Sequence, residues 1–433
     1  MTPLKFIHTF DMHSAPPDLR ARIKLNLLDL IGIAAAGRQT RLAQIINDHA
    51  AENFGGILPM LFDGRKASAQ GAALAAGMTI DSLDGHDGFN PAKGHIGCPM
   101  MPAALMLGHE ANISGQDFLN SLIMGYEFGA RAAMAQHGTV PDYHTSGSWG
   151  ATAAAAAGAR LANLTPDQTG HALGIAEYHG PRSQMMRCID HPTMLKDGAG
   201  WGAMSGVAAV KLALSGFTGA PALTIEQAPD HWQDLGEHWY LREQYFKPYP
   251  VCRWAQPPIE AALKLRQAHH IQPAQIDKIE IITFHQSVRL ATSTPRTTEE
   301  AQYSTSFPVA VALARGTVTP ADIADDNLTD PEILRLSRAM QLREDDTANA
   351  AFPARRIARV AITLLDGRHY ESDWNEARWD ASAPPSENEL REKYHALADP
   401  VLGPRRAGDI ESAIDTLEKT ALNALSQLIL CAL

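Results

Sequence analysis

Residues 276–285 read Ile276-Asp-Lys-Ile-Glu-Ile-Ile-Thr-Phe-His285, with apolar side chains at alternating positions over much of the run. This spacing is typical of a β-strand that buries one face. A second such run covers 356–365, and the Asp366-Gly367 that follows it favours a tight turn into a partner strand. These patterns predict an α+β unit within residues 263–394. The helices that we expect between the two strand patterns are 304–314 and 330–340.

Apolar residues outside this unit recur at helical spacing, and many of them are Ala, Gly or Met, which suits helices that pack closely. A length of 433 residues exceeds one ordinary core, so we expect a second, helical domain at 1–262, completed by 395–433. The predicted fold class is therefore mainly α with an α+β part. The helices that we expect are 17–36, 67–80, 99–110, 115–135, 151–160, 165–180, 199–215 and 408–432.

Composition excludes several classes of function. The net charge is −11 and no basic run is present, which argues against nucleic acid as a partner. No stretch of eighteen apolar residues and no signal-like start occurs, so we expect a cytoplasmic protein without a membrane partner. The four cysteines form no CxxC pair, which argues against a zinc knuckle, an iron–sulfur cluster or a disulfide framework.

The candidate site begins with Asp81-Ser-Leu-Asp84-Gly-His86-Asp87-Gly-Phe-Asn90-Pro-Ala-Lys93-Gly-His95. Its three glycines and one proline forbid a regular helix, so this segment is a predicted loop. Segments of small apolar residues flank it on both sides, which favours a loop that lines a cleft. A solvated acidic surface loop is the plainer alternative.

A metal ion in this loop is a further alternative, because carboxylates and imidazoles are ordinary metal ligands. The spacing of the four possible ligands matches no metal-binding motif, and we predict no metal. These possible ligands are Asp84, His86, Asp87 and His95.

Three further segments carry cations at predicted helix starts or bends. His144 precedes an alanine-rich helix, where backbone N–H groups favour an anion. Arg187 and Lys196 precede a helix of small residues, and Lys247 and Arg253 lie in a segment stiffened by prolines and aromatic rings. A helix cap, an exposed basic loop and a proline-stiffened connector are the plainer alternatives for these three segments.

The sequence lacks the motifs GxGxxG after a strand, Walker A, HExxH and GxSxG, so it offers no main support for nucleotide, zinc or serine-hydrolase chemistry. General acid–base catalysis on a small polycarboxylate remains. That chemistry needs a base, an acid and cations that hold the carboxylates, and the loop and the basic segments supply all three.

Five motifs follow one another in an order that resembles the MmgE/PrpD family, over nearly the whole chain. This family includes 2-methylcitrate dehydratase, cis-aconitate decarboxylase and iminodisuccinate epimerase. The motifs are Asp84-Gly-His-Asp87 with His95 and Gly97, His144 before the alanine-rich helix, Lys196-Asp-Gly-Ala-Gly, Phe-Lys247-Pro-Tyr249-Pro, and Pro295-Arg-Thr-Thr-Glu-Glu-Ala-Gln-Tyr303-Ser304.

The resemblance implies a large all-helical domain formed from both chain ends, a smaller α+β lid domain, a site between them, a homodimer and no cofactor. The catalytic cluster of the family's decarboxylase is similar to Asp84, His95, His144 and Lys196. His95 and His144 are then the acid–base groups, and Asp84 orients a histidine. Lys196 stabilises the anionic intermediate or donates a proton. The residues expected to bind the carboxylate substrate are His86, Asp87, Lys93, Arg187, Lys247, Tyr249, Arg253 and Tyr303.

We therefore expect a cofactor-independent lyase of the dehydratase type. A two-base epimerase of a dicarboxylate and a carboxylate-binding protein without catalysis are the alternatives. Relatives commonly carry a hydroxyl at the positions of Gly88 and Phe307, and often a histidine at Arg253. These departures, with His86 and Asn90 in the loop, point to an altered substrate pocket.

Overall fold

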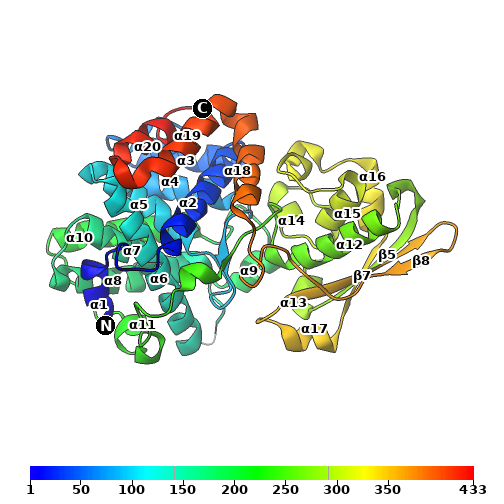
Figure 1. Cartoon of the computed structure of the whole chain (residues 1–433), viewed down its shortest axis with the longest axis horizontal. Helices are drawn as coiled ribbons and strands as arrows, with labels where there is room; N and C mark the ends of the chain where they lie inside the picture. The colour runs from blue at the N-terminus through cyan, green and yellow to red at the C-terminus, as the bar shows by residue number, and fades with distance from the viewer. Residues whose placement is uncertain (141, 291) are drawn as a thin grey trace.

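The computed structural model describes residues 1–140, 142–290 and 292–433. The protein is mainly α with an α+β part, as predicted. Figure 1 shows a large helical lobe that contains both chain ends, and a smaller lobe that carries the main sheet. No helix in the described ranges combines the length and the apolar character needed to cross a membrane.

Closely packed helices form the centre of the large lobe, and glycine allows their backbones to touch. A Cβ atom placed on Gly77 would lie 2.6 Å from the Cα atom of Gly200, so α4 and α10 meet backbone to backbone. The small-residue composition predicted this kind of contact. The central helices are α4 (Ala69–Asp81), α5 (Gly97–Ala111), α7 (Ser146–Leu161) and α10 (Ala199–Leu214).

Three further helices surround this centre, and sequence predicted each of them to within a few residues. Ser114 caps α6 as expected, since its hydroxyl accepts a hydrogen bond from the backbone N–H of Asp117. The surrounding helices are α2 (Asp18–Gly37), α6 (Gly115–Thr139) and α8 (Pro166–His179).

The main sheet has the strand order β6-β5-β7-β8, and β9 (Asn375–Glu376) also pairs with β7. The two predicted strands, β5 (Ile276–Thr283) and β7 (Ile357–Leu364), are antiparallel neighbours. The predicted turn at Asp366-Gly367 leads into β8 (His369–Glu371), and Gly367 has the positive φ of 88° that such turns favour. Sequence missed β6 (Met340–Glu344), which pairs parallel to β5. The helices that contact the sheet or each other in this lobe are α12 (Gln256–Ala268), α15 (Ser306–Arg315) and α16 (Pro331–Arg338).

The prediction of one continuous helix at 408–432 is wrong. The segment forms α19 (Pro404–Thr416) and α20 (Leu422–Ile429), separated by a short 3₁₀ turn and an extended residue. The backbone between them pairs with residues 113–115 instead of continuing the helix: Gly115 N–H donates to the Thr420 carbonyl at 2.8 Å. A long-range contact therefore ends a locally periodic helix.

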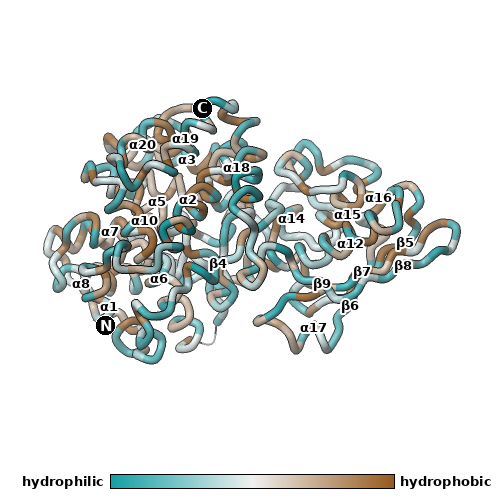
Figure 2. The backbone as a smooth tube through the Cα atoms, in the orientation of Figure 1, coloured by the Kyte–Doolittle hydropathy of each residue, from teal (hydrophilic) through white to brown (hydrophobic). Residues whose placement is uncertain are grey.

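Sequence also missed α18 (Glu387–Leu402), which packs against α2 and brings the chain back to the large lobe. Figure 2 shows this helix as mostly hydrophilic, whereas β5 and β7 carry hydrophobic stretches. The remaining helices and strands are α1 (Pro3–Thr9), α3 (Arg41–Asn53), β1 (Leu58–Pro59), β2 (Lys66–Ala67), β3 (Gly88–Phe89), α9 (Met185–Asp190), α11 (Leu223–Glu226), β4 (Gln244–Tyr245), α13 (His285–Val288), α14 (Thr298–Gln302) and α17 (Asp346–Ala351).

Candidate active site

The charged loop after α4 is buried between the lobes. Its short strand β3 pairs with β4, which joins the loop to the segment that carries Lys247. The side chains of Asp84 and His95 are only 5% and 7% exposed. The alternative of a solvated surface loop is therefore wrong, and the charges of this loop must be met by other protein groups or by a ligand.

A small cavity of about 30 Å³ lies where the loop meets the smaller lobe. Six predicted site residues line it: Asp84, Lys93, His95, Lys247, Arg253 and Tyr303. Cys252 also lines it. The lining residues that sequence reasoning missed are Tyr143, Met185, Asp197, Tyr245, Trp254 and Arg356.

Asp84 and Lys247 form a buried ion pair at the base of this cavity. The Lys247 ammonium donates to the Asp84 carboxylate and, at 3.1 Å, to the Asp84 carbonyl. Burial raises the pKa of Asp84, but the nearby positive charges, Lys247 first among them, outweigh burial and hold this pKa well below its usual value. Asp84 is therefore a permanent anion that fixes the position of Lys247.

His95 is held as a neutral imidazole of one defined tautomer. Its Nδ1 lies 2.5 Å from the backbone carbonyl oxygen of Asp87, which can only accept a hydrogen bond. Nδ1 therefore carries the proton, and Nε2, 3.7 Å from an Asp84 carboxylate oxygen, keeps its lone pair. Burial lowers the pKa of His95 well below its usual value, so this lone pair is free at neutral pH. His95 has the state required of a general base.

Gln302 connects Lys196 to Asp84 in the cavity lining. Its side-chain oxygen accepts from the Lys196 ammonium at 2.7 Å and from the Asp84 backbone N–H at 2.9 Å. The Lys196 ammonium also lies 4.7 Å from the centre of the Tyr303 ring. Lys196 does not line the cavity, but it is buried directly behind the groups that do.

Asp197 adds a second carboxyl group to the lining. Ser146 donates its hydroxyl hydrogen to Asp197 at 2.5 Å and accepts the His95 backbone N–H at 2.9 Å. Burial first, and nearby carboxylates with it, raise the pKa of Asp197 to about 7 and that of neighbouring Asp81 to about 6. Asp81 and Asp84 act on Asp197, and Asp84 acts on Asp81. This pair can therefore hold a proton near the base.

Four of the residues predicted to bind the substrate lie outside the cavity lining and have other surroundings. His86 is fully buried with its ring against His95, at 4.2 Å between centroids. Asp87 is also fully buried, accepts from Tyr126 and Asn26, and has its pKa raised to about 7 by burial. The remaining two are Arg187, which is exposed, and Tyr249, which packs beneath Arg378.

His144 immediately precedes Thr145, the N-cap of α7, as predicted. Its ring is not part of the cavity lining that the described residues form. Its Nδ1 donates to the Asp142 carbonyl at 2.8 Å, which leaves Nε2 as the nitrogen that can accept a proton.

Two buried groups of side chains have the chemistry of metal ligands, with ligand atoms within 4.8 Å of one another. In the group that contains Asp84 and His95, the Asp84 carboxylate is already paired with Lys247, and this cation opposes the binding of a metal ion. The group that contains Asp81 and Cys98 lies deeper. Its third member is His86, whose two ring nitrogens have no partner among the described residues. The groups are Asp81, His86 and Cys98, and Asp84, His86 and His95.

The missing hydroxyl at Gly88 has a steric explanation. A Cβ atom at Gly88 would lie 2.4 Å from the hydroxyl oxygen of Tyr245, which itself lines the cavity. The phenol of Tyr245 therefore fills the space of a residue-88 side chain and brings a hydroxyl to that place. Phe307, in contrast, is fully buried in the hydrophobic core and adds no polar group.

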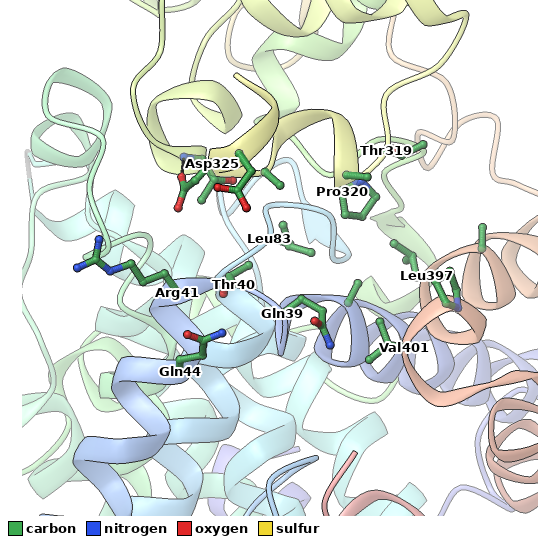
Figure 3. A pocket seen from close by; sticks show the side chains of 17 residues that line it. Gln39, Thr40, Arg41, Gln44, Leu83, Thr319, Pro320, Asp325, Leu397 and Val401 are labelled. Atoms are coloured by element: carbon green, nitrogen blue, oxygen red, sulfur yellow. Dashed lines mark hydrogen bonds between the residues drawn. The ribbon is translucent and has the colours of Figure 1, made fainter. Parts of the chain in front are cut away.

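A larger groove of about 730 Å³ also lies between the lobes, away from these groups. Figure 3 shows Pro320 and Asp325 of the smaller lobe facing Arg41 and, on α18, Leu397 and Val401. Its described lining holds neither histidine nor lysine, and most of it is apolar. The histidine and lysine side chains that could serve acid–base chemistry therefore lie at the smaller cavity.

Comparison with known proteins identifies the family of the chain. Residues 4–231 match the MmgE/PrpD N-terminal domain, and residues 249–419 match the MmgE/PrpD C-terminal domain. The chain belongs to the MmgE/PrpD family. The resemblance that the five sequence motifs indicated is thereby confirmed.

Curated relatives of this MmgE/PrpD chain align over nearly its full length. A cis-aconitate decarboxylase-like protein of Aspergillus oryzae is 25% identical, covering 94% of this chain and 92% of its own. A cis-aconitate decarboxylase of Aspergillus terreus is 24% identical, covering 96% of this chain and 92% of its own. The cis-aconitate decarboxylase of Mus musculus is 23% identical, covering 95% of this chain and 88% of its own. Family and relatives support an enzyme of the lyase type, a dehydratase or a decarboxylase.

Proposed function

We propose that this protein is a cofactor-independent lyase of the dehydratase type that acts on a small di- or tricarboxylate. The observation that carries the proposal is the lone pair of His95 Nε2 beside a cavity rich in cations. Four cationic side chains line that cavity against two carboxyl groups, although the whole chain has a net charge of −11. The four are Lys93, Lys247, Arg253 and Arg356.

In the proposed reaction, His95 Nε2 takes the proton from the carbon next to a substrate carboxylate. The electrons of that C–H bond form the new C=C bond, and the bond to the β-hydroxyl breaks. The hydroxyl leaves as water after it receives a proton, which we assign to Lys196, whose ammonium lies 4.7 Å from the ring of the cavity-lining Tyr303. The cations hold the carboxylates and stabilise the charge that develops beside the carbon.

His144 remains a proposed second acid–base group. Because its Nδ1 is engaged by the Asp142 carbonyl, Nε2 is the atom that would exchange the proton. The smaller lobe acts as a lid in this proposal, because a cavity of about 30 Å³ holds one water rather than a dicarboxylate.

The test is incubation with a panel of 2-hydroxy and 3-hydroxy di- and tricarboxylates in deuterated water, followed by proton NMR. Elimination produces alkene signals, and His95→Asn should remove them, whereas His179→Asn, a change at an exposed histidine, should not. Deuterium in recovered substrate without alkene would indicate the epimerase instead. Thermal stabilisation by an acid without either signal would indicate the binding protein.

We also propose that the chain forms a homodimer through α8 and α10. Several exposed apolar side chains lie on these helices and on the segments beside them, and an apolar surface that a partner covers would bury them. The residues concerned are Tyr178, Leu195, Trp201, Leu212 and Phe217.

A further inference from the structure

A second pocket lies on the outer side of the catalytic cavity. It has a volume of about 330 Å³, and Arg253 and Arg356 line both spaces. The two guanidinium groups therefore stand in the wall between an outer pocket, large enough for a small polycarboxylate, and an inner cavity that is not. Any anion that reaches His95 by this route must pass them.

Arg356 immediately precedes β7 in the smaller lobe and has no carboxylate partner in the part of the chain that the structure describes. It is 8% exposed, and no salt bridge to it occurs among the described residues. Its one side-chain hydrogen bond goes to the amide oxygen of Asn90, at 2.5 Å, and its Nε is buried without a partner. A buried guanidinium with unused donors is costly unless an anion joins it.

Arg253 already has an anion, which the protein itself supplies. Asp380 accepts from the Arg253 guanidinium at 2.7 Å and from the Asn90 side-chain amide at 3.1 Å. Asp380 is more exposed than its partner, at 28% against 6% of the side chain. It lies between β9 and α18, outside both, so its carboxylate can move without breaking regular structure.

We propose that the outer pocket is a second carboxylate-binding site, in which Arg356 captures an incoming di- or tricarboxylate and a substrate carboxylate then replaces Asp380 on Arg253. This inference deepens the proposed function, on which it rests. Asn90 contacts both Asp380 and Arg356, so it joins the two arginines into one receptor. The exchange involves no covalent step, and one carboxylate takes the place of another.

The charges of this receptor favour the exchange. Arg253 and Arg356 carry two positive charges and Asp380 supplies one negative charge, so one positive charge remains for the first substrate carboxylate. A second carboxylate on the same molecule can then compete with Asp380 at high local concentration. The site thereby selects acids with two or more carboxylates over acids with one.

Titration calorimetry with tricarballylate, a tricarboxylate that has no hydroxyl to eliminate, tests the inference. Arg356→Gln should weaken binding about tenfold or more, because a charge-assisted contact is lost. Arg356→Lys should recover part of the affinity. Asp380→Asn should tighten binding several-fold, because the internal competitor is gone. Arg359→Gln, which removes an arginine of β7 paired with Glu371, is the matched control and should leave binding unchanged.

Unchanged affinity in Arg356→Gln, or weaker binding in a folded Asp380→Asn, would overturn the inference. The preference for tricarballylate over acetate should also fall in Arg356→Gln. The proposed function fails separately: wild-type protein that shows these shifts yet converts no hydroxy acid is a carboxylate binder with the exchange site. Protein that eliminates water while both variants bind normally is a lyase without it.

Discussion

The Nδ1 of His95 lies 2.5 Å from the backbone carbonyl oxygen of Asp87, so the main chain of the charged loop decides which ring nitrogen is basic. Burial lowers the pKa of His95 well below that of a free histidine. Because the proposed role of His95 requires the neutral imidazole, lowering the pH should reduce kcat/KM only well below pH 6.5. A profile of kcat/KM against pH, measured with the carboxylic acid that reacts, shows where this decrease begins. An acid limb at the usual histidine pKa would contradict the assignment.

His86 should make stability depend on pH. Burial lowers its pKa to about 3, so the unfolded chain binds this proton below pH 6.5 while the folded chain does not. The contribution is therefore fully present above pH 6.5 and is lost as the pH falls toward 3. When the pH falls from 7 to 5, the wild type should lose about 2 kcal/mol more unfolding free energy than His86→Phe does. Denaturant unfolding of both proteins at each pH measures this difference. Asp87, whose raised pKa gives stability the opposite pH dependence, is present in both proteins, so its effect cancels.

Breaking the Asp84–Lys247 pair should be costly. Lys247→Met leaves a buried carboxylate without its partner and should destabilise the fold by about 3 kcal/mol. Adding Asp84→Asn should recover part of that loss, because the uncompensated charge is removed. Urea unfolding of the two single variants and the double variant measures the coupling, and purely additive losses would show that the pair does not act as a unit.

Lys196→Ala and His144→Ala should each abolish turnover while the protein stays folded. Lys196 reaches the site through Gln302 and Tyr303, whereas His144 lies outside the cavity lining. Activity and near-ultraviolet circular dichroism should be measured on the same samples. Retention of most activity in both variants would remove them from the catalytic group. Loss in Lys196→Ala alone would leave His95 as the main acid–base histidine.

The apolar side chains on α8 and α10 should hold two copies together. Trp201→Glu combined with Leu212→Glu places charges in the proposed interface and should shift the protein from dimer to monomer. Sedimentation velocity of wild type and variant at micromolar concentration measures the change. Ile57→Glu, at an exposed apolar residue elsewhere, is the control. A monomeric wild type would rule out the dimer.

Sequence predicted the elements whose patterns are local. β5, β7 and α2 carry their own periodicity, and Ser114 carries its own cap, so each could be placed without knowledge of the rest. The tail could not be placed, because pairing between Gly115 and Thr420 breaks it, and that contact joins residues some three hundred positions apart.

The site was predicted in part for the same reason. Asp84, His95 and Lys247 stand in motifs dense with ionisable groups, and they meet at the cavity. Arg356 stands alone at the start of a strand, where nothing in the sequence separates it from a solvent-facing arginine. Tyr245 gave no signal either, since its hydroxyl matters only because Gly88 leaves room for its ring.

The cavity between the lobes has room for about one water molecule, so a substrate that binds there leaves almost no space for solvent beside it. In the proposed reaction, a proton taken by His95 therefore has almost no solvent with which to exchange until the lobes open. It returns to the same carbon more often than it escapes, so deuterium enters recovered substrate more slowly than the C–H bond is broken. The enclosure also keeps the carbanion from being quenched by bulk water before the β-substituent leaves.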